Sequence, residues 1–373
     1  MAASEAIQTI SRLTPLADVL VMLDAGVKAV TQRTIDVSAA AGRTLATDAL
    51  APVRPASALA LQDGWALRAN ETLGAGGYAP SPLLRTPSRV EAGQAMPAGT
   101  DSVAPIGAVK VIDGRAEALL AVNSGDGVLA AGVDSDSAIP LRRAGERLRN
   151  TDLAAFSAVG IACIMVREPR ILVLPVRGSG IISAAARLVA ADIERRGGSA
   201  RLDESGRGLD VAMAAESADS IVAIGGTGSG RNDNSVQTLA REGRLAIHGM
   251  ALVPGETAAL GFVGARPVLL LPGRLDAALS VWLVVGRRLL DRLAAARSSE
   301  NELAETLPLA RKVSSTVGLV EVVPVRRNAG KAEPLATKYL PLSSLARSDG
   351  WVLVPAESEG FAGGASVQVR QWP

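Results

Sequence analysis

The sequence predicts a multidomain α/β protein with a central, mostly parallel sheet and helices on both of its faces. Three observations lead to this fold class. Between residues 169 and 296, strand-like apolar runs alternate with helical patterns. Before residue 135, and again after residue 296, short apolar runs recur between turns rich in glycine, proline and serine. Alternation is typical of βα units, whereas closely spaced short strands are typical of small β domains.

We therefore expect four domains. Residues 1–47 and 135–168 would form a helical linker domain, 48–134 a small β domain, 169–296 the α/β domain and 297–373 a small β-barrel-like domain. Within the linker domain, helical patterns cover 15–30 and 37–50, with Gly42 as an interruption of the second. A further helix is expected after an N-cap at Thr151.

The α/β segment begins with a strand at 171–176 and a helix that Gly197 and Gly198 close. The next expected elements are a strand at 198–202, a helix at 210–217, a strand at 220–224, a helix at 234–243, strands at 249–253 and 267–273, and a helix at 276–296. Beyond residue 296, the runs at 318–327, 351–356 and 366–372 predict a small antiparallel β domain.

Composition and charge narrow the chemistry. Lys plus Arg number 39 against 37 Asp plus Glu, with no basic block, so we expect no nucleic-acid partner. No apolar run reaches bilayer length and no signal peptide is evident, which predicts a cytoplasmic protein without a membrane partner. The single cysteine, Cys163, is expected to be a core thiol. The single histidine, His248, is expected to be structural on a strand, which argues against His-based catalysis and zinc.

The segment 218–233, ADSIVAIGGTGSGRND, is the most informative part of the chain about a binding site. Four glycines fall among the six residues 225–230, between an apolar strand and a helix that Asn232 or Asp233 could cap. Such a turn presents backbone N–H groups to an anion, although a tight βα turn without a ligand would have the same pattern. Three further turns, at 177–180, 254–257 and 272–274, should lie near the same edge of the sheet. The candidate binding residues are Arg177, Gly225, Gly226, Ser229, Gly230, Arg231, Pro254, Gly255, Gly273 and Arg274.

The order of several motifs resembles a known family. The chain is similar to molybdopterin molybdenumtransferases of the MoeA and gephyrin E-domain type in an ordered set of motifs: SRLTPL at 11–16, AGRTLATD at 41–48, DGWALRA at 63–69, MPAGTDSV at 96–103, Gly-x-Asp at 132–134, the glycine-rich element at 225–233, PG at 254–255 and LPG at 271–273. The resemblance implies an elongated homodimer in which the small β domain of one subunit completes the molybdopterin cleft of the other. It also implies insertion of molybdate into adenylylated molybdopterin, assisted by Mg²⁺.

Three acidic residues match positions of the family's site region: Asp63, Asp134 and Asp233. Turn or cap carboxylates are the alternative interpretation for all three. Gly225, Gly226, Ser229 and Gly230 match the family's pterin-phosphate loop.

The chain also departs from the family's pattern. The family's Thr-Gly-Asp-Glu segment is replaced in this chain by residues 176–179. The family's Asp-Ser/Thr-Asn is replaced by residues 183–185, and the family's Asn-Ser by Leu59-Ala60. Val253 and Glu256 replace two lysines, and Arg274-Leu275 replaces Asn-Pro. The loss of carboxylates predicts weaker Mg²⁺ binding, and no metal ligand set is assigned.

Two functions remain open. One is the molybdenumtransferase reaction itself. The other is a binding or delivery protein that holds molybdopterin, or the finished cofactor, for a molybdoenzyme or for another cofactor-biosynthesis protein. The missing carboxylates favour the second function, and the resemblance along nearly the whole chain favours the first.

Overall fold

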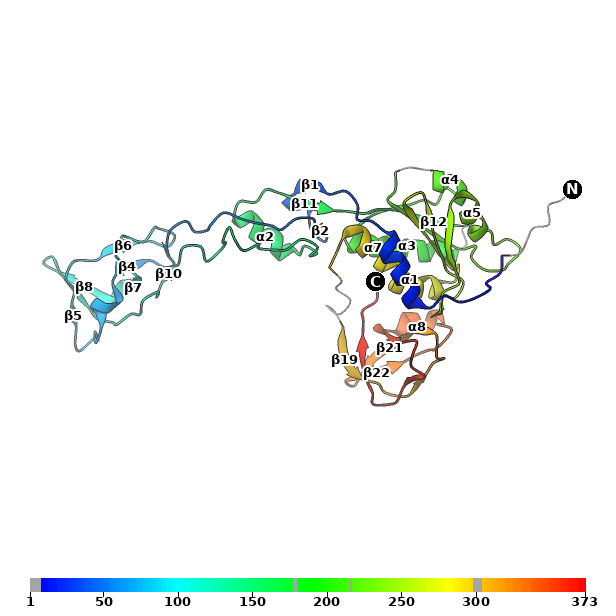
Figure 1. The fold of residues 1–373 in the computed structure, drawn as a ribbon. Helices are drawn as coiled ribbons and strands as arrows, with labels where there is room; N and C mark the ends of the chain where they lie inside the picture. Colours follow the sequence, from blue (N-terminus) through cyan, green and yellow to red (C-terminus); the bar gives the residue numbers. More distant parts are fainter. Residues whose placement is uncertain (1–7, 177–179, 215–216, 298–303) are drawn as a thin grey trace.

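The computed structural model describes residues 8–176, 180–214, 217–297 and 304–373. Figure 1 shows an elongated molecule in which the α/β unit and the C-terminal β unit lie at one end. A narrow arm leads from them to the small β unit at the opposite end. The predicted multidomain α/β fold class is confirmed. No helix among the described residues has both the length and the apolar character needed to cross a membrane.

The central sheet has six strands in the order β13-β12-β14-β18-β17-β15. They are β12 Arg170–Pro175, β13 Ser199–Leu202, β14 Ser220–Ile224, β15 Arg244–His248, β17 Ala259–Val263 and β18 Arg266–Leu271. Neighbouring strands from β13 to β18 in this order pair in parallel. Strand β17 pairs antiparallel with both of its neighbours, β18 and β15. All five residues of β14 are buried, as expected for a parallel strand that is covered on both faces.

Alternate residues of the strands contact helices on opposite faces of the sheet. On one face, Val222 and its neighbours pack with four helices: α1 Leu16–Gly26, α3 Gly180–Arg195, α6 Leu275–Val281 and α7 Arg287–Ala294. On the other face, Ile221 packs with α4 Leu209–Ala214 and α5 Ser235–Glu242. A π-helical turn, Trp282–Gly286, joins α6 to α7, and the Trp282 ring lies against Gly286, where a Cβ would collide with it.

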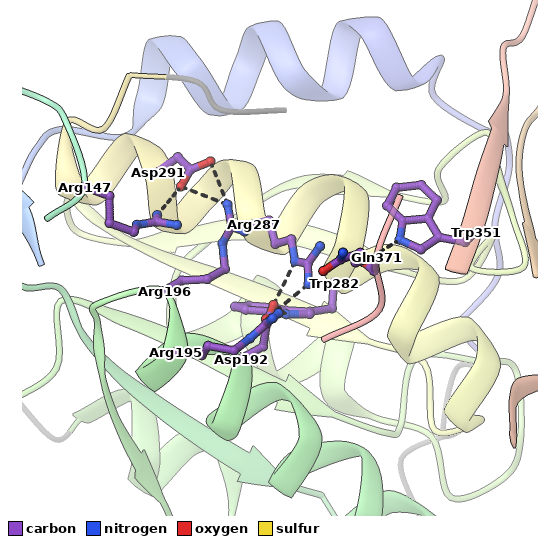
Figure 2. Close-up of polar contacts among 9 residues, drawn as sticks. All are labelled: Arg147, Asp192, Arg195, Arg196, Trp282, Arg287, Asp291, Trp351 and Gln371. Carbon is purple, nitrogen blue, oxygen red and sulfur yellow. Dashed lines mark hydrogen bonds and ion pairs between the residues drawn. The ribbon is translucent and has the colours of Figure 1, made fainter. Parts of the chain in front are cut away.

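A buried carboxylate joins α3 to this long helix (Figure 2). Asp192 accepts hydrogen bonds from Trp282 Nε1 and Arg287 Nε, both at 2.8 Å, and from Arg195 Nη2 at 2.5 Å. Burial opposes ionisation of Asp192, but these hydrogen bonds and the Arg287 charge lower its pKa below the ordinary value. The charged carboxylate therefore cross-links the helices on one face of the sheet.

The N-terminal part of the chain, from α1 into the arm, differs from prediction. The helix at 15–30 ends at Gly26, and 37–50 forms no α-helix. The chain instead forms β1 Arg33–Asp36, a 3₁₀ turn at Val37–Ala39 and β2 Thr44–Leu45, which pair on either side of β11 Cys163–Arg167. Gly42 has a φ of +77°, which turns the chain into β2, so strand pairing overrides the helical propensity of the alanines.

Two further predictions in the arm are wrong. Helix α2, Asn150–Ala158, starts after Arg149 rather than after Thr151, because Asp152 Oδ2 accepts the Arg149 N–H at 2.8 Å. Cys163 is exposed rather than in the core. Its neighbours Ile164 and Val166 take the inward positions of β11, which leaves Cys163 on the outer face by the period of two.

The two β units consist of short, mostly antiparallel strands. The small unit contains β3 Leu59–Ala60, β4 Gly64–Leu67, β5 Ser81–Pro82, β6 Ser88–Val90, β7 Ser102–Pro105, β8 Val109–Ile112, β9 Arg115–Ala118 and β10 Val128–Leu129, with 3₁₀ turns at Ala69–Thr72 and Ile106–Ala108. The C-terminal unit contains β19 Glu305–Pro308, β20 Val313–Ser314, β21 Val320–Asn328, β22 Lys331–Pro334, α8 Leu342–Arg347, β23 Gly350–Val354, β24 Gly360–Phe361 and β25 Ser366–Val369. The expected strand at 249–253 shortens to β16 Leu252–Val253 and pairs with β21, outside the central sheet.

Candidate functional site

The carboxyl ends of β12, β14 and β18 lie side by side, because Pro175 pairs with Ile224 and Ile224 with Leu271. The glycine loop, residues 225–230, leaves the middle strand. An ideal Cβ on Gly273 would lie 3.5 Å from the Gly225 Cα, so two of the predicted turns are in contact. The third turn contains Arg177, which lies outside the described residues. The strand edge therefore brings the glycines together in the way that a parallel sheet predicts.

Glycine is required at the first two positions of the loop. Gly225 and Gly226 have φ of +106° and +72°, a region that side chains disfavour. A Cβ at Gly225 would lie 3.0 Å from the Val176 carbonyl oxygen, and one at Gly226 would collide with Ser235 Oγ. The backbone of the loop thus lies closer to its surroundings than any side chain would allow.

The carbonyl oxygens of the loop are held by donors from three directions. Gln8 Nε2 donates to the carbonyl oxygens of Gly226 and Gly228 at 2.8 and 2.5 Å. His248 Nε2 lies 3.3 Å from the carbonyl oxygen of Thr227. His248 thus has the structural position on β15 that the sequence predicts.

Helix α5 supplies further donors to the same carbonyl groups. Ser235 Oγ donates to Gly225 O at 2.9 Å, and Ser235 N donates to Gly226 O at 3.0 Å. Asp233 N donates to Gly230 O at 2.8 Å. Five of the six loop carbonyls therefore accept hydrogen bonds, with Ser229 the exception among the contacts of the described residues.

The N–H groups of the loop are in the opposite situation. In the described part of the chain, those of residues 226–229 and 231 have no hydrogen-bond acceptor. The N–H of Gly225 donates to Leu271 O at 2.8 Å and that of Gly230 to Asp233 Oδ2 at 3.2 Å. A loop with occupied carbonyls and unoccupied N–H groups at the start of a helix attracts an anion.

Asp233 closes the loop instead of capping the helix. Helix α5 starts at Ser235 after Asn234, so the prediction that Asn232 or Asp233 is the cap is wrong by one or two residues. The Asp233 carboxylate lies close to the positions that Cβ atoms on Gly228 and Gly230 would occupy, at 2.8 and 3.0 Å. A negative charge therefore lies against one end of the loop.

The turn at 254–257 also reaches the glycine loop. Thr257 Oγ1 lies 2.9 Å from Thr227 Oγ1. Gly255 has a φ of +142°, and its N–H donates to the Glu256 carboxylate at 2.9 Å. The carboxylate at position 256 is thus used within its own turn beside the loop.

Arg274 projects from the start of α6 and is held by two partners. Its Nε and Nη2 donate to the buried Asp276 carboxylate at 3.0 and 2.5 Å, which raises the Arg274 pKa above its ordinary value. The guanidinium also lies over the Tyr339 ring, 4.9 Å from its centroid. Asp276 accepts the Leu340 N–H at 3.1 Å as well, so the same carboxylate joins α6 to the C-terminal unit.

The other predicted binding residues differ in exposure. Ser229 on the glycine loop and Arg231 directly after it are exposed and have no side-chain partner within the described residues. Pro254 is buried in its turn.

The three predicted acids do not meet in one chain. Asp63 directly precedes β4 in the small β unit, at the far end of the molecule from the α/β unit that carries Asp233 (Figure 1). Its carboxylate accepts the Ala92 N–H at 2.9 Å, which is the turn role named as its alternative. Asp134 is exposed where Arg54 pairs with Ser135, at the inner end of the small β unit. Across the described ranges, no cluster of three or more His, Cys, Asp or Glu residues could hold a metal ion.

Gln8 is the residue that sequence reasoning missed. It lies 218 residues from Gly226 in the chain and is only 7% exposed. A lone glutamine before the first helix carries no periodic or motif signal, so only the fold reveals this contact.

Three family models match the chain in order. Residues 1–160 match the "MoeA N-terminal region (domain I and II)", 202–292 the "Probable molybdopterin binding domain" and 306–372 the "MoeA C-terminal region (domain IV)". A protein of Methanocaldococcus jannaschii named "Putative molybdopterin biosynthesis protein" is 31% identical over 153 residues, or 40% of this chain. That match spans 36% of the relative's length, about a third of it.

Solved structures show the same fold over nearly all of this chain. Two structures of the molybdopterin biosynthesis MoeA protein from Pyrococcus horikoshii have TM-scores of 0.75 and 0.78 and identities of 23% and 20%. A molybdenum cofactor biosynthesis protein from Pyrococcus furiosus has a TM-score of 0.61 at 20% identity. Each match covers 97% of this chain and 100% of the other.

Proposed function

The chain belongs to the MoeA family of molybdopterin biosynthesis proteins, and we propose that it binds the phosphate of molybdopterin on the glycine loop. One observation carries the proposal: five of the six loop carbonyls accept hydrogen bonds, while the N–H groups of residues 226–229 and 231 have no acceptor in the described structure. A phosphate supplies several acceptor oxygens, which matches a row of unoccupied donors.

Two arginines near the loop support an anionic ligand and oppose the negative charge of the Asp233 carboxylate at one end of the loop. Arg231 is exposed at the end of the loop, and Arg274 starts the helix that follows Gly273. Arg274 uses Nε and Nη2 for Asp276, so its Nη1 side remains for an oxyanion. An arginine that a carboxylate already orients loses little entropy when it binds a second anion.

Insertion of molybdate is the finer part of the proposal and requires a second copy of the chain. Because Asp63 and Asp134 lie far from Asp233 in one chain, we infer that Asp63 and Asp134 of the partner subunit would reach the glycine loop in a homodimer. The small β unit exposes large apolar side chains that a partner could cover: Leu61, Leu73, Tyr78, Leu84, Ile106 and Leu120, with exposed fractions of 50% or more.

The second candidate is binding or delivery of the cofactor without insertion. One observation favours it: Arg274 already pairs with both oxygens of the buried Asp276 carboxylate, which therefore is poorly placed to hold Mg²⁺. Hard cations require oxygen ligands that are not already neutralised by a guanidinium.

One assay separates these functions. Purified protein is supplied with adenylylated molybdopterin, Mg²⁺ and molybdate, and AMP release is followed together with activation of an apo-molybdoenzyme. Transfer predicts both signals, whereas delivery predicts bound molybdopterin without AMP release. Gly226→Ala should abolish binding in either case, because its Cβ would collide with Ser235. Gly76→Ala, at a glycine of the small β unit with open space around it, is the control. Equal molybdopterin binding by both variants would overturn the loop assignment.

A further inference from the structure

We propose that Gln8 is a positioning residue that holds the glycine loop in its phosphate-binding conformation. This inference rests on the proposed function for the identity of the phosphate, but it concerns a residue outside the sequence motifs quoted above. Gln8 contacts two carbonyl groups of the loop and would act on the ligand only through the loop backbone.

The side-chain amide of Gln8 contacts two peptide groups of the loop at once. A single Nε2 donates to Gly226 O at 2.8 Å and to Gly228 O at 2.5 Å. An amide nitrogen has two N–H groups, so both hydrogen bonds can form together. The side chain is 7% exposed, which shields these bonds from competing water.

Peptide planarity converts these contacts into an orientation of the donors. In a trans peptide, the carbonyl of one residue and the N–H of the next point in opposite directions. When Gln8 draws the carbonyls of Gly226 and Gly228 to itself, the N–H groups of Thr227 and Ser229 point away from it, on the same side of the loop. Neither of these N–H groups has an acceptor in the described parts of the chain.

The amide orientation follows from its partners. Both groups that Gln8 meets are carbonyl oxygens, so only nitrogen can face them, and Oε1 must point elsewhere. Oε1 is buried and has no donor among the described residues. The glutamine therefore leaves one acceptor unsatisfied while it holds the loop, which indicates that the loop contacts determine its position.

The segment that carries Gln8 is itself anchored. Thr14 N donates to Gly249 O at 3.0 Å, and Ala251 N donates to Thr14 O at 2.8 Å. Ile10 lies against Gly249, where a Cβ would come within 2.5 Å of its Cγ2. The N-terminal segment thus runs beside the chain that follows β15, and it delivers Gln8 to the loop from outside the βα unit.

The test compares Gln8→Ala and Gln8→Glu with the control Thr9→Ala, which removes an exposed neighbour. Binding of inorganic phosphate and of molybdopterin is measured by calorimetry on the full-length protein, and thermal unfolding is recorded for each variant. Loss of two hydrogen bonds that orient the donors should weaken phosphate binding by roughly tenfold or more. Thr9→Ala should bind like the wild type, and all variants should remain folded.

Gln8→Glu adds a readout that a merely structural role would not change. An ionised carboxylate would face two carbonyl oxygens, whereas a protonated one could donate to one of them. The ratio of variant to wild-type phosphate affinity should therefore rise as pH falls toward about 5. The charged or titratable groups near the loop are Arg231, Asp233, His248 and Glu256, and both proteins contain all four, so the ratio reports on position 8.

The outcomes keep this inference separate from the proposed function. If the wild type binds molybdopterin and Gln8→Ala binds it equally well, Gln8 has no positioning role although the function stands. If the wild type binds inorganic phosphate in a Gln8-dependent manner but not molybdopterin, the inference stands and the function fails. Absence of phosphate binding by the wild type would overturn the inference.

Discussion

Arg147 Nη2 lies 3.1 Å from Asp291 Oδ1 and thereby connects the segment before α2 to helix α7 (Figure 2). Arg196, at the end of α3, reaches the same carboxylate at 3.4 Å. Asp291 is 6% exposed, and desolvation of Arg147 lowers the pKa of its guanidinium. A single carboxylate thus balances two arginines at the junction between the arm and the α/β unit.

At this junction, loss of the shared carboxylate should reduce stability more than loss of one of its two arginine partners. Asp291→Asn leaves two partly buried guanidinium groups without an anion and should lower the free energy of unfolding by about 2–4 kcal/mol. Arg147→Ala leaves Arg196 to pair with Asp291 and should cost about 1–2 kcal/mol. Urea unfolding measures both. Arg143→Ala, at an exposed position of the same segment, is the control and should change stability by less than about 0.5 kcal/mol. A cost for Asp291→Asn no larger than the control's would contradict this account.

The elements that the sequence predicts well are those whose environment is uniform. The run at 220–224 is apolar at every position except its first, Ser220, because both faces of β14 are covered by helices, and the glycines after it follow from the sharp turn. The segment at 37–50 misleads because alanines favour a helix locally, while pairing of Thr44 and Leu45 with β11 decides the structure. Strand pairing over more than 100 residues of chain leaves no local trace in composition.

The candidate site shows the same division. The glycines of the loop are visible in the sequence, since only glycine fits their backbone angles and close contacts. The donors that hold the loop carbonyls, Gln8 and His248, come from segments that only the fold brings there. Sequence therefore predicts where the backbone must turn, but not which distant side chains orient it.

The lowered pKa of Asp192 predicts that the folded protein loses stability at acid pH. Because its pKa is lowered in the folded state, ionised Asp192 stabilises the fold at pH values above its unfolded pKa, near 3.8. This contribution is lost as pH falls below about 4 and through the folded pKa. Asp192→Asn removes the titrating group and leaves Arg287 without its partner, so the stability difference from the wild type should be constant near neutral pH and shrink below about pH 4.

Urea unfolding of both proteins between about pH 7 and pH 2.5 measures this difference. Other carboxylates with lowered pKa values, such as Asp24 and Asp152, titrate in both proteins and cancel. A difference that stays constant across the whole range would show that Asp192 does not contribute to acid unfolding.

Substitution of Arg274 should mainly lower phosphate affinity, whereas substitution of Asp276 should mainly lower stability. Arg274→Lys keeps the charge but loses the two-point contact with Asp276, so phosphate affinity should fall by roughly fivefold to tenfold with little change in stability. Asp276→Asn also weakens the contact with Leu340 N and should lower the free energy of unfolding by about 1–3 kcal/mol. Phosphate calorimetry and urea unfolding separate the two effects. Equal stability loss in both variants would mean that Arg274 serves the fold rather than the ligand.

The proposed homodimer predicts complementation between two damaged chains. If the glycine loop of one subunit meets the small β unit of its partner, Asp63→Asn and Asp233→Asn each damage both sites of their own homodimer. A mixed dimer contains one site with both substitutions and one with neither, so it should recover about half of the wild-type molybdate insertion or molybdopterin retention.

Co-expression with two different affinity tags isolates the mixed dimer for this measurement. Asp113→Asn, in the exposed β8–β9 turn with a φ of +48°, is the matched control because asparagine tolerates that conformation, and it should keep wild-type activity. An inactive mixed dimer formed from two inactive homodimers would rule out a site shared between subunits. Full activity of Asp63→Asn would show that this carboxylate serves only the Ala92 turn, where its hydrogen bond already accounts for it.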